Sequence, residues 1–182
     1  MNTKHNRYNI ALTLVEESKE IIQCAEYFSQ FADQYKLNEK SLPHVTICQF
    51  NSAESDVYNL WEQVCQAVDQ PFLSLRFNQY SFFQGDGSAW ISLLPEEGEM
   101  LNELNCAVAG IIKKPINRSF QHYDPHMTLI NTSKIDQTKA EELFAAQPID
   151  VKVNSILSLG LSDEIGQLIE LRRVCDQRQL RV

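Results

Sequence analysis

The sequence has 182 residues, 43% of them hydrophobic and 22% charged, enough apolar material to bury the core of one ordinary domain. Its formal net charge of −8 argues against tight, non-specific binding of long RNA or DNA, because proteins that hold long nucleic acids through phosphate contacts are usually basic. No apolar run approaches the roughly 20 residues that cross a bilayer, and five cysteines without C-x-x-C spacing are typical of reduced thiols in a cytoplasmic protein.

Hydrophobic periodicity and turn residues divide the chain into alternating strands and helices. A Gly-Asp-Gly turn at residues 85–87 separates two apolar runs and predicts a hairpin, because glycine adopts the positive φ that such turns require. In chain order, we expect strand 8–15, helix 16–36, strand 42–50, helix 52–68, strands 72–83 and 88–94, helix 95–114, strand 125–130, helix 136–146 with Asp136 as its N-cap, and strands 149–161 and 167–174.

The order of these elements in the second half of the chain approximately repeats the order in the first half. Strands and helices interleaved with hairpins favour an α+β fold. We expect two antiparallel sheets, each backed by helices packed outside, and a central groove between the two lobes. Residues 1–182 are expected to form this single bilobal domain, as a monomer without a membrane partner.

One short pattern, Pro-His-apolar-Thr-apolar, occurs once in each half of the chain. It covers Pro43–Ile47 (PHVTI) and Pro125–Leu129 (PHMTL), both on predicted strands. Side chains alternate between the two faces of a strand, so the histidine and the threonine of each motif share one face. If the two lobes oppose each other, two imidazoles and two hydroxyls meet in one cavity.

Two imidazoles and two hydroxyls suit the hydrolysis of a phosphodiester. Histidine titrates near pH 6.5, so a neutral imidazole can take a proton from water while a protonated one delivers a proton to the departing oxygen. Threonine hydroxyls can donate hydrogen bonds to the non-bridging phosphate oxygens. A cyclic phosphate, with a strained ring and a tethered leaving hydroxyl, needs no more than this.

Two other readings of these histidines compete with the catalytic one. A single histidine on a strand is more often a structural residue, and only the matched pair makes the pattern specific. A metal site is weaker still, because two histidines without a nearby carboxylate or thiolate fall short of the three protein ligands of a catalytic zinc. His122 precedes His126 by four residues, but that spacing aligns two ligands only on a helix. We therefore expect neither a metal nor another cofactor.

At these motifs the sequence resembles the two-histidine (2H) phosphoesterase superfamily, which includes the RNA 2′,3′-cyclic phosphodiesterases long called 2′-5′ RNA ligases. The resemblance implies a bilobal, pseudo-twofold fold that hydrolyses cyclic phosphates without a metal. It also implies a catalytic tetrad of His44, Thr46, His126 and Thr128, with His44 as acid and His126 as base. Many members carry a phosphate-contacting arginine five residues after the second histidine, where this sequence has Asn131.

The substrate expected from these features is a nucleotide or short RNA end that carries a 2′,3′-cyclic phosphate. Tyr123 and Phe82 could stack a base, and Arg118 could supply positive charge. Other substrates stay open, among them cyclic ADP-ribose phosphate, 2′-5′ oligoadenylate and non-nucleotide cyclic phosphates. A nucleotide-binding module without turnover is the alternative from a different class.

Overall fold

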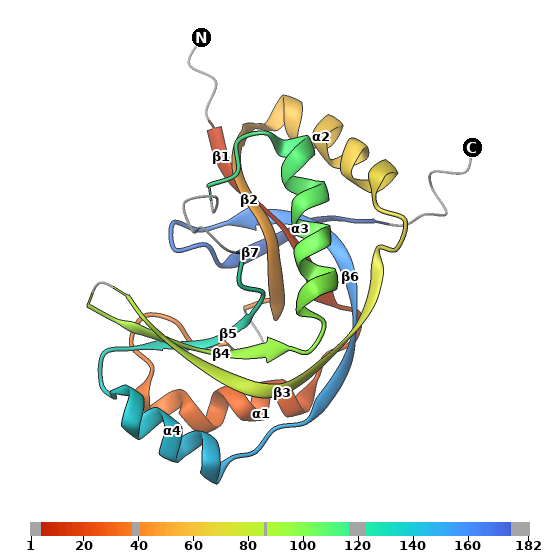
Figure 1. Cartoon of the computed structure of the whole chain (residues 1–182). Coiled ribbons are helices and arrows are strands. Elements are labelled where there is room, and N and C mark those ends of the chain that lie inside the picture. The colour runs from red at the N-terminus through yellow and green to blue at the C-terminus, as the bar shows by residue number, and fades with distance from the viewer. Residues whose placement is uncertain (1–4, 38–40, 86, 117–122, 176–182) are drawn as a thin grey trace.

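The computed structural model describes residues 5–37, 41–85, 87–116 and 123–175 of the chain. Strands and helices alternate along it as the sequence predicts, and the fold is α+β (Figure 1). The elements are β1 (His5–Leu14), α1 (Lys19–Phe28), the 3₁₀ helix η1 (Ser29–Phe31), β2 (His44–Ala53), α2 (Glu54–Ala67), β3 (Phe72–Gln84), β4 (Ala89–Pro95), α3 (Gly98–Ile112), β5 (Met127–Thr132), α4 (Gln137–Ala146), β6 (Val151–Ser162) and β7 (Leu168–Val174).

All seven strands belong to one hydrogen-bonded antiparallel sheet with the order β2-β1-β6-β3-β4-β5, and β7 also pairs with β6. The strand β6 belongs to both lobes: residues 155–161 pair with β1, while residues 151–156 pair with β3. The prediction of two separate sheets was therefore wrong in this detail, because the length of β6 lets one strand serve both lobes. We call β1, β2, β7 and the second half of β6 the first lobe, and β3, β4, β5 and the first half of β6 the second lobe.

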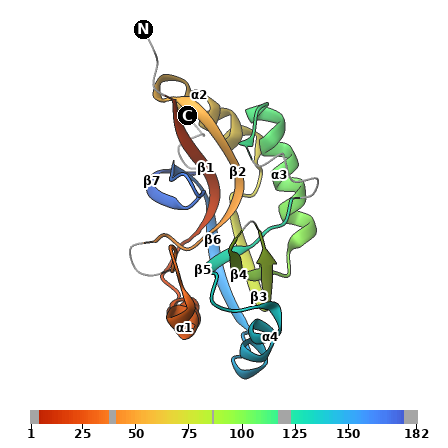
Figure 2. The same cartoon turned by 90° about the vertical axis from the view of Figure 1, so that its left-hand side faces the viewer.

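Each lobe is backed by two helices. The helices α2 and α3 pack against β2 in the first lobe, whereas α1 contacts β5 and α4 contacts β3 in the second (Figures 1 and 2). In α2 the buried residues are Val57, Trp61, Val64 and Cys65, which follow the helical spacing expected of one apolar face. Asp136 caps α4 as predicted, since its carboxylate accepts a hydrogen bond from the backbone N–H of Lys139 at 2.9 Å.

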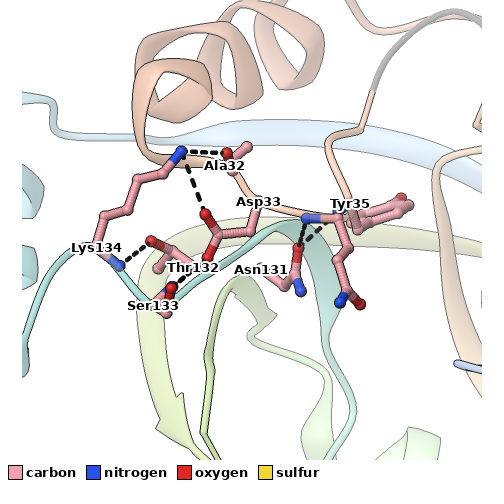
Figure 3. Close-up of polar contacts among 8 residues, drawn as sticks. Ala32, Asp33, Tyr35, Asn131, Thr132, Ser133 and Lys134 are labelled. Carbon is pink, nitrogen blue, oxygen red and sulfur yellow. Dashed lines mark hydrogen bonds and ion pairs between the residues drawn. The ribbon is translucent and has the colours of Figure 1, made fainter.

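The helix predicted for residues 16–36 ends at Phe28, and the segment 32–37 instead runs along the outer edge of β5. Backbone hydrogen bonds join Leu37 N–H to the Leu129 carbonyl at 2.7 Å and Asn131 N–H to the Tyr35 carbonyl at 3.1 Å. The Asp33 carboxylate adds bonds to the backbone and hydroxyl of Ser133, and an ion pair with Lys134 at 3.2 Å (Figure 3). This segment, which we call the strap, therefore ties the chain just before the first motif to the strand that carries the second.

Gly160 lies in the part of β6 that pairs with β7, next to irregularities in the register of these two strands. A Cβ atom at this position would lie 2.3 Å from Leu168 Cδ1 and 2.5 Å from the Glu170 carbonyl oxygen. Real Cβ atoms do not approach a backbone oxygen so closely, so a side chain here would push β7 away from β6. In contrast, a Cβ on Gly110, which is exposed in α3, would meet nothing within 4 Å.

These two glycines form a matched pair for a stability test. We expect Gly160→Ala to lower the free energy of unfolding by about 1–3 kcal/mol, through overpacking between β6 and β7. Gly110→Ala should raise it by about 0.5–1 kcal/mol, because glycine is a poor residue for a helix interior. Urea unfolding followed by circular dichroism measures both values. Equal stabilities of the two variants would contradict the close approach of β7 to Gly160.

Candidate active site

Both motif histidines are held by the same local hydrogen bond. His44 Nδ1 lies 2.8 Å from the Leu42 carbonyl oxygen, and His126 Nδ1 lies 2.7 Å from the Asp124 carbonyl oxygen. A carbonyl oxygen only accepts, so each Nδ1 must carry a hydrogen. In the neutral ring the other nitrogen, Nε2, is then an unprotonated acceptor. The two rings are thus in the same tautomer, and each presents Nε2 for acid–base chemistry.

The fold brings the two motifs together at the starts of β2 and β5. These strands are in contact, and their N-terminal ends lie side by side in both views (Figures 1 and 2). The Tyr123 hydroxyl, just before the second motif, donates to the backbone carbonyl of Thr46 in the first at 2.6 Å. The charge of His126 also affects the pKa of His44. His126 is therefore close enough to His44, across the two lobes, for its charge to lower the pKa of His44.

The two strands share a further irregularity that extends the repeat beyond the two motifs. The pairing of β1 with β2 shifts by one residue at Ile47, and the pairing of β4 with β5 shifts at Leu129. Each shift lies three residues after the histidine of its motif. A β-bulge of this kind inserts one residue and changes which later side chains share a face. As a result, Gln49 and Asn131, each five residues after its histidine, join the face that carries the threonine.

The two carboxamides each hold a flanking segment in place. Gln49 Nε2 donates to the Gly166 carbonyl in the β6–β7 turn at 2.8 Å. Asn131 Oδ1 accepts from the backbone N–H groups of Gln34 at 2.9 Å and Tyr35 at 2.6 Å, in the strap (Figure 3). Asn131 is buried and committed to these bonds. The residue that stands where many 2H phosphoesterases have an arginine therefore anchors the strap.

The two histidines differ in their surroundings. His44 is only 7% exposed, whereas His126 is exposed. Burial lowers the pKa of His44 to about 4, and the nearby His126 charge acts in the same direction, while the Leu42 carbonyl and the Asp163 carboxylate oppose the shift. His44 is consequently neutral near pH 7, because removing its charged form from water is costly.

The two threonines also differ. Thr46 Oγ1 accepts a hydrogen bond from Asn9 Nδ2 at 3.1 Å. Within the part of the chain that the structure describes, the Thr128 hydroxyl has no hydrogen-bond partner. Thr128 lies opposite Ser92 of β4, while the residues on the other face, Met127 and Leu93, are buried in the core.

The residues expected to bind the substrate have different placements. Tyr123 is half-buried and its hydroxyl is used in the bond to Thr46. Phe82 packs against the hydrophobic core, whereas the neighbouring Phe83 is 54% exposed and by strand alternation shares the face of Thr128 through the pairing of Ser81 with Ser92. Arg118 and His122 lie outside the described residues.

Within residues 5–37, 41–85, 87–116 and 123–175, no group of three or more histidine, cysteine, aspartate or glutamate side chains could hold a metal ion. None of the helices in these ranges is long and apolar enough to span a membrane.

Sequence reasoning missed Asn9, Gln49 and Asp163. Asn9 is completely buried in the middle of β1. The sequence feature that could have pointed to it is a polar carboxamide inside the apolar run YNIALTLV, four residues before Thr13 and on the same strand face. Asp163 lies in the β6–β7 turn, where its carboxylate accepts from the backbone N–H groups of Ile165 and Gln167. A turn gives no sequence signal for which distant strand it will approach.

Several solved structures have the same fold. E. coli LigT complexed with NADP+ aligns with a TM-score of 0.61 at 14% identity, covering 94% of this chain and 97% of LigT. E. coli LigT complexed with 3′-AMP gives a TM-score of 0.59 at 13% identity, over 94% and 96% of the two chains. Usb1 from Kluyveromyces marxianus gives 0.51 at 12% identity, over 86% and 94%. These likenesses concern the fold, since the sequences have diverged widely.

Among curated protein sequences, none matches this chain. A family model does match, over residues 18–160, which include both motifs and most of the sheet. The chain belongs to the 2′-5′ RNA ligase superfamily.

Proposed function

We propose that the protein is a metal-independent phosphodiesterase that opens a 2′,3′-cyclic phosphate on a nucleotide or a short RNA end. The observation that carries this proposal is the matched pair of histidines whose Nδ1 atoms are both tied to backbone carbonyls. Such tethers leave one Nε2 in each lobe to accept or donate a proton, as acid–base catalysis of phosphodiester hydrolysis requires. Membership of the 2′-5′ RNA ligase superfamily supports phosphoester chemistry in general.

The difference in burial between the two histidines supports different roles for them, His44 as general base and His126 as general acid. Neutral His44 takes a proton from the attacking water through Nε2, while protonated His126 delivers its Nε2 proton to the departing ribose oxygen. Thr46 and Thr128 donate hydrogen bonds to the non-bridging phosphate oxygens as charge develops there. This assignment is the reverse of the one implied by the resemblance. It is supported by the solvation of the two rings, because a buried imidazolium is costly and an exposed one keeps its water.

The nature of the substrate is suggested by similar structures and by the charge of the chain. Structures of the similar LigT hold NADP+, ATP, 3′-AMP and phosphate, which favours a nucleotide phosphate as the ligand here too. The net charge of −8 disfavours a long RNA. A panel of nucleoside 2′,3′-cyclic phosphates, 2′-5′ oligoadenylate, cyclic ADP-ribose phosphate and non-nucleotide cyclic phosphates separates the remaining alternatives by kcat/KM.

The tetrad can be tested with histidine variants and a matched histidine control. We expect His44→Ala and His126→Ala each to lower kcat on a 2′,3′-cyclic nucleotide by about 10²- to 10⁴-fold, the usual range for losing a general acid or base. His5→Ala should leave kcat unchanged, because His5 is exposed and pairs with Ala53 at the far end of β2. Activity should persist in excess chelator. Full activity in either motif variant would refute the proposal, and binding without product at any pH would favour a nucleotide-binding module.

A leaving group that needs no proton distinguishes the base from the acid. Nitrophenolate departs from a p-nitrophenyl phosphodiester unprotonated, so on this substrate the acid becomes dispensable while the base does not. We expect His126→Ala to regain most of its lost activity on the nitrophenyl ester and His44→Ala to stay inactive. The opposite pattern would restore His44 as the acid.

The pH dependence of kcat/KM offers an independent check of the same assignment. As a base His44 must be unprotonated, and burial lowers its pKa to about 4. We therefore expect kcat/KM to rise with pH through about 4 and to be nearly complete by about pH 5. An acid with this pKa would carry its proton in only about one molecule per thousand at pH 7. A fall in kcat/KM between pH 4 and pH 5 would contradict the role of His44 as base, whereas a fall at higher pH is expected from loss of the proton on the acid.

A further inference from the structure

A chain of hydrogen bonds with fixed direction runs from Arg7 toward Thr46. Arg7 Nη2 donates to Gln49 Oε1, and a guanidinium group can only donate. The carboxamide of Gln49 is thereby oriented, with its Nε2 donating to the Gly166 carbonyl at 2.8 Å. Gly166 has φ +94°, and a Cβ there would lie 2.7 Å from Gln49 Nε2. Only glycine lets the turn come this close to β2.

Asn9 receives its orientation from the same carbonyl. Its Nδ2 faces the Gly166 oxygen at 3.4 Å and Thr46 Oγ1 at 3.1 Å. Because a carbonyl oxygen only accepts, the side of the Asn9 amide that faces Gly166 is its NH₂ group. The Thr46 oxygen is then an acceptor toward Asn9. The hydroxyl hydrogen of Thr46 has to point elsewhere.

This orientation of Asn9 is unfavourable for the fold by itself. Asn9 is completely buried, and its Oδ1 has no hydrogen-bond partner among the described residues. A buried acceptor without a partner destabilises a protein, so its presence calls for an explanation. Turning the amide over would bring Oδ1 to Thr46 as an acceptor, but it would also set Oδ1 against the Gly166 oxygen.

We propose that Asn9 is a positioning residue, which holds the Thr46 hydroxyl as a hydrogen-bond donor to a phosphoryl oxygen of the substrate. The inference rests on the proposed function. In the second lobe, the position equivalent to Asn9, opposite Asn131, is Trp90, and no described residue bonds the Thr128 hydroxyl. On this proposal Thr46 is a donor of fixed direction, whereas Thr128 has no such partner among the described residues.

The test compares two substitutions of Asn9 in three backgrounds. Asn9→Asp removes the NH₂ donor, so that Thr46 must donate to the new side chain when its carboxyl is ionised, and Asn9→Leu removes the lock without adding charge. We expect Asn9→Asp to lower kcat on a cyclic nucleotide by about 10- to 100-fold, the scale of one lost transition-state donor, and Asn9→Leu to lower it less. In a Thr46→Val background both effects should shrink to less than about twofold, while in a Thr128→Val background they should persist in full.

Inorganic phosphate affinity, measured by calorimetry, repeats the comparison without turnover. Equal losses from Asn9→Asp with and without Thr46 would overturn the inference. If no cyclic phosphate is hydrolysed by the unmodified protein, the proposed function fails. The phosphate measurement still decides the role of Asn9, which is refuted if the affinity does not depend on Asn9 or if no phosphate binds.

Discussion

The pairing of β6 along both of its edges is the constraint on which the positions of both motifs depend. One edge takes β1, which in turn holds β2 and the first motif, and the other edge takes β3, which leads through β4 to β5 and the second motif. The outermost strands of the two lobes then meet at their motif ends. The strap on β5 and the bond from Tyr123 to β2 close this arrangement from both sides. Each motif is thus held partly by the segment that precedes the other one.

The internal symmetry of the fold extends further than its chemistry does. Both motifs share the imidazole tether, the bulge three residues after the histidine, and a carboxamide two residues after the bulge. The surroundings differ, however, since His44 is buried beside polar groups of the first lobe and His126 faces solvent. Within this symmetric frame, burial lowers the pKa of His44. Under the proposed function, this environment would make His44 the base.

Much of this was predictable from the sequence, and the parts that were not share a physical cause. The α+β class, the elements in their order and the Asp136 cap follow from local periodicity and capping chemistry, which nearby residues determine. The single sheet was not predictable, because β6 pairs with β1 over a separation of nearly the whole chain. The early end of α1 was missed because residues 32–37 satisfy their backbone groups on β5 rather than within a helix. Similarly, the orientation of the Asn9 amide was not predictable, because it depends on the carbonyl of Gly166, a residue far away in sequence.

Under the proposed role of Asn9, the unequal surroundings of Thr46 and Thr128 have a stereochemical consequence. The two non-bridging oxygens of a 2′,3′-cyclic nucleotide are not equivalent, because the chiral ribose makes them diastereotopic. Here one oxygen would meet a donor whose geometry is set before binding, and the other a donor that adjusts after binding. Such a site would distinguish the pro-R from the pro-S oxygen at phosphorus. Its preference between phosphorothioate diastereomers would then depend on Asn9 in β1, a strand that carries neither motif histidine.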